Sequence, residues 1–130
     1  MTVRISRSVL ARIVAQAEAS GDEICGLLFG RPDAILDAQP APNVAADPAR
    51  AFEIDPAILI QAYRAARHGG PRPIGHYHSH PTGDPAPSAR DAAAAPGDGA
   101  LWLIVGVTGA RLWRNDAPHR FVPMAMTHDM

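Results

Sequence analysis

Three histidines alternate along one short segment of the chain, and their spacing could bring two of them to a single metal ion. His76, His78 and His80 lie in the segment GHYHSHPTGDPAPSARD at residues 75–91. On a strand, side chains two residues apart share a face and lie about 6.6 Å apart, so two neighbouring imidazoles can reach one ion. His76 and His80 are about twice as far apart, which leaves His76/His78 or His78/His80 as the pair. We favour His78/His80, because Pro81 places that pair at a strand end, where a loop can supply a third ligand.

Ser88 and Asp91 close the same segment with the spacing Ser-x-x-Asp. The spacing matches a helix-capping box, in which the serine side chain accepts a hydrogen bond from a first-turn N–H. A cap would also hold Asp91 on a rigid element at the mouth of the loop, as a metal ligand requires. Two histidines and one carboxylate leave a fourth tetrahedral position for water, which is the pattern of a catalytic zinc site.

Glu23 is the candidate base for such a site. Metal-assisted hydrolysis needs a group that takes a proton from water. Glu23 opens the apolar segment EICGLLFG, where a carboxylate is costly to bury unless it has a partner. The alternative is an exposed residue at the start of a strand.

The apolar pattern predicts the elements that must position these side chains. Helical periodicity and capping residues predict helices over residues 6–19, 56–68 and 88–94. Apolar runs and turn residues predict strands over residues 2–5, 23–30, 34–38, 51–54, 72–78, 101–107, 110–114 and 120–123. We expect a loop over residues 39–50 and a frayed, Met-rich end. Strands interleaved with three helices indicate an α/β fold with a mixed sheet.

The composition is that of an ordinary globular chain. Its 130 residues are 47% hydrophobic and 19% charged, which is enough for one domain with its own core. The net charge of −1 gives no reason to expect a nucleic acid or an anionic membrane as partner. No run approaches the about 18 apolar residues of a membrane span. Cys25 is the only cysteine, so no internal disulfide forms, and a cytoplasmic location is expected.

The types and spacing of these candidate site residues make the sequence resemble the JAMM (MPN-plus) family of zinc metalloproteases. The family signature Glu…His-Ser/Thr-His-Pro-x6-Ser-x2-Asp is matched by Glu23, by HSHP at 78–81, by Ser88 and by Asp91. A match at all of these spacings is far more specific than a lone His-x-His pair.

The resemblance carries an expected fold. It covers about residues 3–115 and is closest in character to the compact bacterial members of the family. It implies a single domain over residues 1–130, with an edge strand and tail over 116–130. It also implies a mixed, mostly antiparallel curved sheet packed by about three helices, in a three-layer arrangement similar to that of cytidine deaminases.

The resemblance also implies a function and a role for each residue. One catalytic Zn²⁺ would be held by His78, His80 and Asp91. Glu23 would be the general base, and Ser88 would donate a hydrogen bond to the tetrahedral oxyanion. The reaction would be hydrolysis of a peptide or isopeptide bond after the Gly-Gly tail of a ubiquitin-like or sulfur-carrier protein. The alternative is a non-catalytic interaction module with the same fold.

Two residues near this set keep more than one interpretation. His76 is either a hydrogen-bond partner of the metal ligands or a packed strand residue. Cys25 is expected to be a buried core thiol, although its spacing from Glu23 would allow it to lie near the metal. A homodimer is left open by the sequence.

Overall fold

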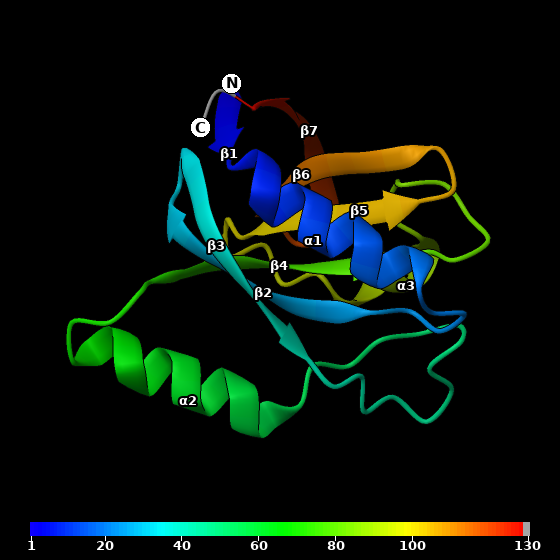
Figure 1. The fold of residues 1–130 in the computed structure, drawn as a ribbon, viewed down its shortest axis with the longest axis horizontal. Coiled ribbons are helices and arrows are strands. Elements are labelled where there is room, and N and C mark those ends of the chain that lie inside the picture. Colours follow the sequence, from blue (N-terminus) through cyan, green and yellow to red (C-terminus); the bar gives the residue numbers. More distant parts are fainter. Residues whose placement is uncertain (129–130) are drawn as a thin grey trace.

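The structure is a computed structural model that describes residues 1–128. Its elements are, in chain order, β1 (Thr2–Ile5), α1 (Arg7–Glu18), β2 (Cys25–Arg31), β3 (Ala34–Ala41), α2 (Pro56–Arg67), β4 (Pro73–Ser79), α3 (Ala89–Ala94), β5 (Leu101–Gly106), β6 (Gly109–Ala117) and β7 (Arg120–Thr127) (Figure 1). The predicted α/β fold with three helices is therefore confirmed. No helix within residues 1–128 has the length and apolar character needed to cross a membrane.

The seven strands form one mixed sheet that closes on itself. Their order is β1-β3-β2-β4-β5-β6-β7, and β7 pairs again with β1. Four pairings are antiparallel (β2–β3, β2–β4, β5–β6 and β6–β7), and three are parallel (β1–β3, β1–β7 and β4–β5). The predicted curved, mostly antiparallel sheet is present, and its curvature is strong enough to make a barrel.

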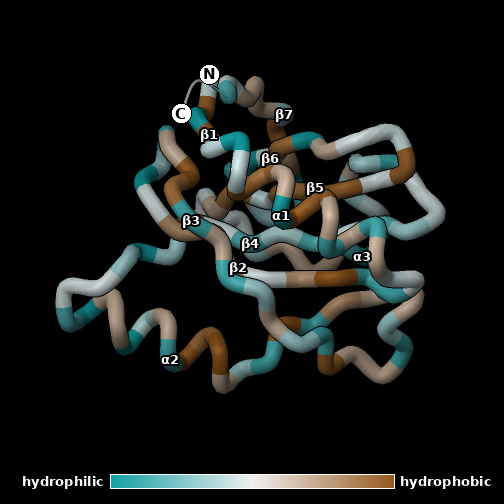
Figure 2. The backbone as a smooth tube through the Cα atoms, viewed as in Figure 1, coloured by the Kyte–Doolittle hydropathy of each residue, from teal (hydrophilic) through white to brown (hydrophobic). Residues whose placement is uncertain are grey.

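A helix covers each face of this sheet. Strand residues alternate between the two faces, so each face presents apolar side chains on which a helix can pack. On one face Leu28 and Tyr77 pack with Val9 and Ile13 of α1, which crosses the front of the sheet in Figure 1. On the other face Cys25, Leu27 and Phe29 pack with Ala62 and Leu59 of α2. The backbone coloured by hydropathy shows apolar stretches along β2 and β5 (Figure 2). These stretches supply apolar side chains to the core.

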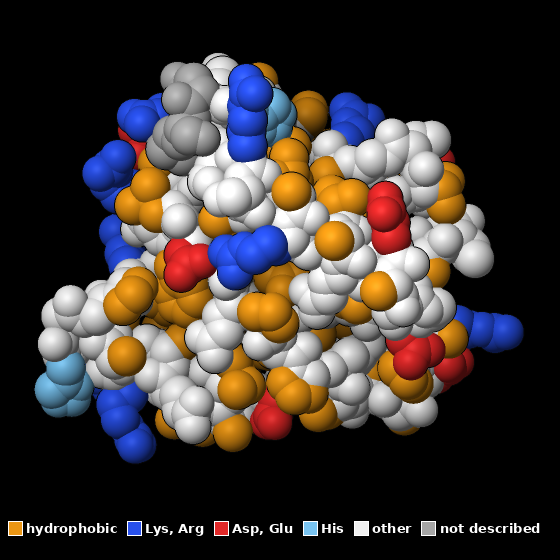
Figure 3. Space-filling model, in the orientation of Figure 1, with side chains coloured by type: hydrophobic (Ala, Val, Ile, Leu, Met, Phe, Trp, Pro, Cys, Tyr) orange, Lys and Arg blue, Asp and Glu red, His pale blue; other side chains and the backbone are white. Residues whose placement is uncertain are grey.

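The second helix leaves part of its own apolar surface uncovered. Ile60 is 57% exposed and Tyr63 is 56% exposed. Hydrophobic side chains reach the surface over α2, along the lower edge of the view in Figure 3. This helix therefore has one face on the core and another that is available for contacts.

Strand β3 is longer than predicted and includes Pro40. Residues 39–41 were expected in a loop, but β3 continues through Pro40, which pairs with Gly26. A proline is tolerated there because β1 pairs only with Ala34 and Ile35, so the remainder of β3 is an edge on that side. The strand predicted over 51–54 is also wrong, since that segment makes only an isolated bridge between Asn43 and Ile54.

The C-terminal strand is longer and better held than predicted. We expected an edge strand over 120–123, whereas β7 runs from Arg120 to Thr127 and pairs with both β6 and β1. Met124 and Met126 pack against the main core, so the Met-rich segment is not frayed there. The part of that prediction that concerns residues 129–130 lies outside the described residues.

Candidate metal centre

Three donor atoms from two elements converge at the end of β4. The Nε2 atoms of His78 and His80 lie 3.1 Å apart. Asp91, in α3, places its Oδ2 atom 3.2 Å from the first nitrogen and 3.1 Å from the second. His78 and Asp91 are buried, and His80 is half-buried at the loop mouth. The structure therefore brings Asp91 and the two histidines together at the end of the loop.

The chemistry of this triangle fits a divalent metal ion. Ligands bound at 2.0–2.1 Å around a tetrahedral zinc are about 3.3 Å from one another, close to the spacing of the three atoms. His80 Nδ1 lies 2.7 Å from the carbonyl oxygen of Asp84, to which it can only donate. In the neutral imidazole this leaves Nε2 with a lone pair that faces the Asp91 carboxylate. A cation between the donors relieves the repulsion between these lone pairs.

The capping box at the start of α3 fixes Asp91. The Ser88 hydroxyl oxygen accepts a hydrogen bond from the Asp91 N–H at 3.0 Å, and the Ser88 N–H donates to Asp91 Oδ2 at 2.9 Å. Burial acts to raise the pKa of Asp91. Without a metal ion, His78 and the protonated form of His80 can donate hydrogen bonds to its carboxylate, which outweigh burial and hold that pKa well below its usual range. The cap and the metal site are thus one structure, as the two interpretations of the Ser-x-x-Asp spacing allowed.

The ring of His78 is held by packing with an aromatic residue. Phe52 stacks on it with ring centroids 4.1 Å apart and planes 18° apart. His78 Nδ1 is buried and has no hydrogen-bond partner among the described residues, so the stacked ring takes over the orienting role. No role for Phe52 was expected from the sequence. Its only signal was a lone aromatic residue beside a Pro-, Ala- and Asp-rich loop.

Glu23 lies beside the two histidines, just before β2 begins. One of its carboxylate oxygens and the imidazole nitrogens of His78 and His80 all lie within 4.8 Å of one another. Burial is the main cause that raises the pKa of Glu23 to about 7; Asp91 adds to the rise, while His80 and Arg90 oppose it. We expected a strand from residue 23, but the strand starts at Cys25.

Two side chains with no role predicted from the sequence hold the segment around Glu23. The amide of Asn43 donates to the backbone carbonyls of Glu23 and Ala51, each at 2.9 Å. The hydroxyl of Ser79, between the two ligand histidines, accepts a hydrogen bond from the Ile24 N–H at 2.9 Å. The middle serine of the HSHP segment therefore ties Glu23 to the metal-binding strand.

A small cavity joins the base to the cap. Glu23, Ser88 and Asp91 line a space of about 70 Å³ together with Phe52 and Trp102. The space is large enough for water, and polar groups are available on its wall. The Ser88 oxygen accepts a bond from Asp91, so its hydroxyl proton is available to donate into this space.

His76 and Cys25 lie outside the donor triangle. The His76 ring is 6.4 Å from that of His78, whereas the His78 and His80 rings are 4.9 Å apart. His76 instead packs 4.3 Å from Trp102 and makes no hydrogen bond to the donors. The Cys25 thiol points to the carbonyl of Ala41 at 3.6 Å in the α2-side core, which confirms the expected core thiol.

Comparison with known proteins identifies a matching family and several similar proteins. A family model described as prokaryotic homologs of the JAB domain matches residues 6–116. A desampylase of Haloferax volcanii is 40% identical over 110 residues, 78% of this chain and 79% of that protein. A probable TtuB-protein conjugate cleaving protease of Thermus thermophilus is 34% identical over 101 residues, 78% of this chain and 65% of that protein.

A solved structure confirms the architecture. The JAB1/MPN domain protein AF2198 of Archaeoglobus fulgidus superposes with a TM-score of 0.63 at 21% identity, covering 97% of this chain and 98% of that chain. The three-layer MPN-type fold expected from the sequence is therefore present.

Proposed function

Because this chain belongs to the prokaryotic JAB-domain family and is a hydrolase of the JAMM type, we propose that it cuts ubiquitin-like or sulfur-carrier proteins from their conjugates. The bond would be a peptide or isopeptide bond after the carrier's C-terminal tail. The two similar proteins described above are named for removing such modifiers or for cleaving their conjugates. The observation that carries the proposal is the triangle of His78, His80 and Asp91 donors with Glu23 beside it.

Each side chain has a part that follows from its place. His78, His80 and Asp91 would hold one zinc ion, which supplies Lewis-acid polarisation of the scissile carbonyl and a lowered pKa for water. Glu23 takes the proton from the attacking water and returns it to the leaving amine. Ser88 donates its free hydroxyl proton to the oxygen on which negative charge develops.

The wider assignments follow the same proposal. A non-catalytic interaction module gains no support, because every donor of the site is retained and in place. We propose a single domain that acts in the cytoplasm, with no nucleic acid or membrane partner, consistent with the net charge of −1 and one unpaired cysteine. Light scattering of the purified protein decides between a monomer and a homodimer.

Cleavage of a designed conjugate tests the proposal. The substrate is a small carrier ending in Gly-Gly, linked through that tail to the amine of a fluorescent reporter. The zinc-loaded protein should release the reporter, and Glu23→Gln should retain the metal but lose about 10²- to 10⁴-fold in rate. His78→Ala and Asp91→Ala should lose the metal itself, measured by elemental analysis.

The matched control is Asp84→Ala, which removes an exposed carboxylate and keeps the backbone carbonyl that orients His80. It should keep both metal and activity. Purified protein that binds no zinc, or a Glu23→Gln variant as fast as the parent, would contradict the proposal.

A further inference from the structure

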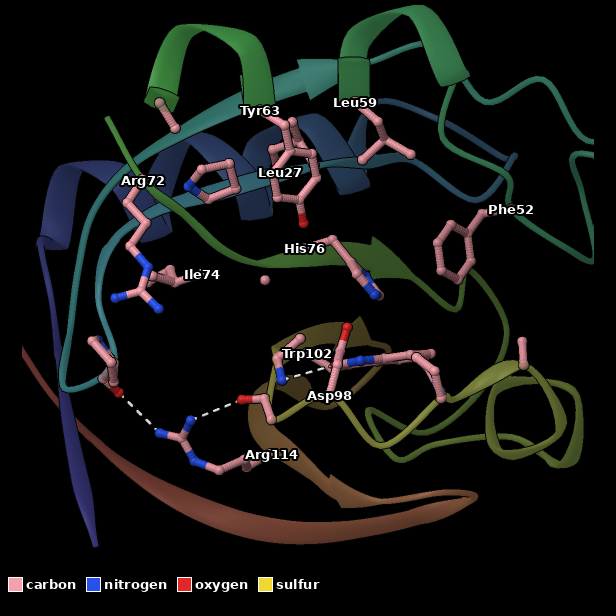
Figure 4. A pocket seen from close by; sticks show the side chains of 18 of the residues that line it. Leu27, Phe52, Leu59, Tyr63, Arg72, Ile74, His76, Asp98, Trp102 and Arg114 are labelled. Carbon is pink, nitrogen blue, oxygen red and sulfur yellow. Dashed lines mark hydrogen bonds between the residues drawn. The ribbon is translucent and has the colours of Figure 1, made fainter. Parts of the chain in front are cut away.

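A groove of about 770 Å³ extends away from the metal centre along the outer face of β4. Tyr63 and Leu59 of α2 form one wall, and Trp102 lies across from them, as Figure 4 shows. Phe52 and Trp102 line both this groove and the small cavity that contains Glu23. The groove therefore leads to the site of reaction.

The start of β4 and the residue before it supply the floor of the groove. Every residue from Arg72 to His76 lines it, with Arg72 at one end and His76 at the other. The same strand continues to His78, one of the proposed metal donors. Arg72 is six residues before His78, a distance of about 20 Å along an extended chain. A substrate segment lying extended in the groove would pass His76, then Ile74, and then Arg72 as it leaves the metal.

The end of the groove far from the metal carries uncompensated positive charge. Arg72 and Arg114 lie together at that end in Figure 4, opposite His76 and Phe52. Arg114 donates only to neutral carbonyls, those of Gly99 and Pro32, each at 2.9 Å.

Arg67, the last residue of α2, also lines the groove. The guanidinium groups of Arg67 and Arg72 have no hydrogen-bond or ion-pair partner among residues 1–128. The one acidic residue in the lining is Asp98, whose carboxylate accepts from the Ala100 N–H at 3.1 Å. Three cations therefore face one anion, in a chain whose net charge is −1.

We propose that Arg67 and Arg72 select carrier tails that bear an acidic side chain about six residues before the bond that is cut. The inference rests on the proposed function, since it takes the C-terminal segment of the carrier as the occupant of the groove. Charge complementarity identifies the occupant: exposed, unpaired guanidinium groups attract a carboxylate, and they repel a tail that is basic at the same position. The apolar middle of the groove, at Ile74 and Tyr63, accepts an uncharged side chain between the two ends.

The test uses three carrier–reporter fusions that differ only in Glu, Ser or Arg at the sixth residue before the scissile bond. The zinc-loaded protein should cut the Glu tail with a kcat/KM about three- to tenfold above that of the Arg tail, mainly through KM. The preference should shrink as salt rises from 50 to 500 mM, because exposed charges are screened. The double variant with Arg67→Glu and Arg72→Glu should prefer the Arg tail instead.

Arg64→Glu is the matched control, because Arg64 is on the same helix one turn earlier and does not line the groove. It should keep the order of the three tails. A second readout needs no cleavage: fluorescence anisotropy of the three tail peptides on the Glu23→Gln protein should give the same order of affinity.

The outcomes separate the two proposals. Equal rates for all three tails, or an order unchanged by the double substitution, overturn the charge selection while the hydrolase stands. A protein that cuts none of the tails but binds the Glu peptide best retains the groove assignment and removes the proposed reaction. A protein that neither cuts nor binds any tail refutes both.

Discussion

Replacing Glu23 with glutamine should make the metal-free protein more stable at alkaline pH while it removes activity. Burial raises the pKa of this carboxyl from 4.5 to about 7 in the folded state. The folded protein therefore keeps the proton over a range of pH in which the unfolded chain has lost it. Stability is then lost as the pH rises from about 4.5 through about 7, because the unfolded state gains from ionisation first.

The size of the effect follows from that difference. One pKa unit corresponds to about 1.4 kcal/mol, so the buried carboxylate costs the native state up to about 3 kcal/mol at pH 8 and almost nothing at pH 4. Glutamine carries no charge at either pH. The free energy of unfolding of Glu23→Gln should therefore exceed that of the parent by up to about 3 kcal/mol at pH 8, and the two should be nearly equal at pH 4.

Urea unfolding in the presence of a chelator, followed by tryptophan fluorescence at pH 4, 6 and 8, measures these differences. Glu53→Gln changes an exposed carboxylate nearby and should shift neither curve. Adding zinc should cancel the advantage of the glutamine variant, since a nearby cation favours the charged carboxylate. A difference between variant and parent that does not change with pH would refute the electrostatic reasoning, as would a variant that is less stable at pH 8.

Two further substitutions test how the site and the sheet are built. Ser88→Ala should reduce stability by about 0.5–2 kcal/mol through loss of the α3 cap, and kcat by about 10²- to 10³-fold; urea unfolding and the reporter assay measure these. If kcat is unaffected, Ser88 serves only to position Asp91. Gly75→Ala should destabilise the protein by more than the about 1–3 kcal/mol of ordinary overpacking, because a Cβ would overlap the Leu101 carbonyl of the neighbouring strand. Thermal melts of the two variants and the parent measure this, with Gly21→Ala as the control because a Cβ there meets open space. Equal melting temperatures for Gly75→Ala and the parent would show that β4 and β5 can separate at this position.

The donor triangle could be predicted because its geometry is largely local. Alternation on a strand restricts the metal-binding pair to neighbours in the series, and the Ser-x-x-Asp cap fixes where Asp91 stands on its helix. Both relations span only a few residues. Glu23 was a candidate base from its place in an apolar segment, with an exposed strand-start residue as the alternative, and the family resemblance favoured the base; its approach to His78 depends on pairing between β2 and β4.

Phe52 and Asn43 could not be predicted, because their roles depend on the path of a loop. The loop folds back across the start of β2, where the Asn43 amide bonds to the Glu23 carbonyl and Phe52 reaches the His78 ring. No periodic pattern specifies that path. A polar amide with several backbone partners looks, in the sequence, like any other loop residue.

The extent of β3 and β7 was missed for a different reason. Pro40 and Pro123 both argue against a central strand, and each is allowed only because its strand lacks a neighbour on one side at that point. Whether such a neighbour is present depends on pairing between distant parts of the chain. Local sequence signals carry no information about that pairing.

The pairing of β1 with β7 determines when the barrel can close during synthesis of the chain. It joins Thr2, Val3 and Arg4 to Ala125, Met126 and Thr127, so the ring cannot close until the chain as far as Thr127 has left the ribosome. Closing so long a loop is entropically costly and slow. The proposed metal donors and the base lie between residues 23 and 91, and so does the β2–β4 pairing that joins Cys25 to His78. During synthesis the nascent chain therefore carries all the proposed zinc-binding side chains before the barrel that encloses its core is complete.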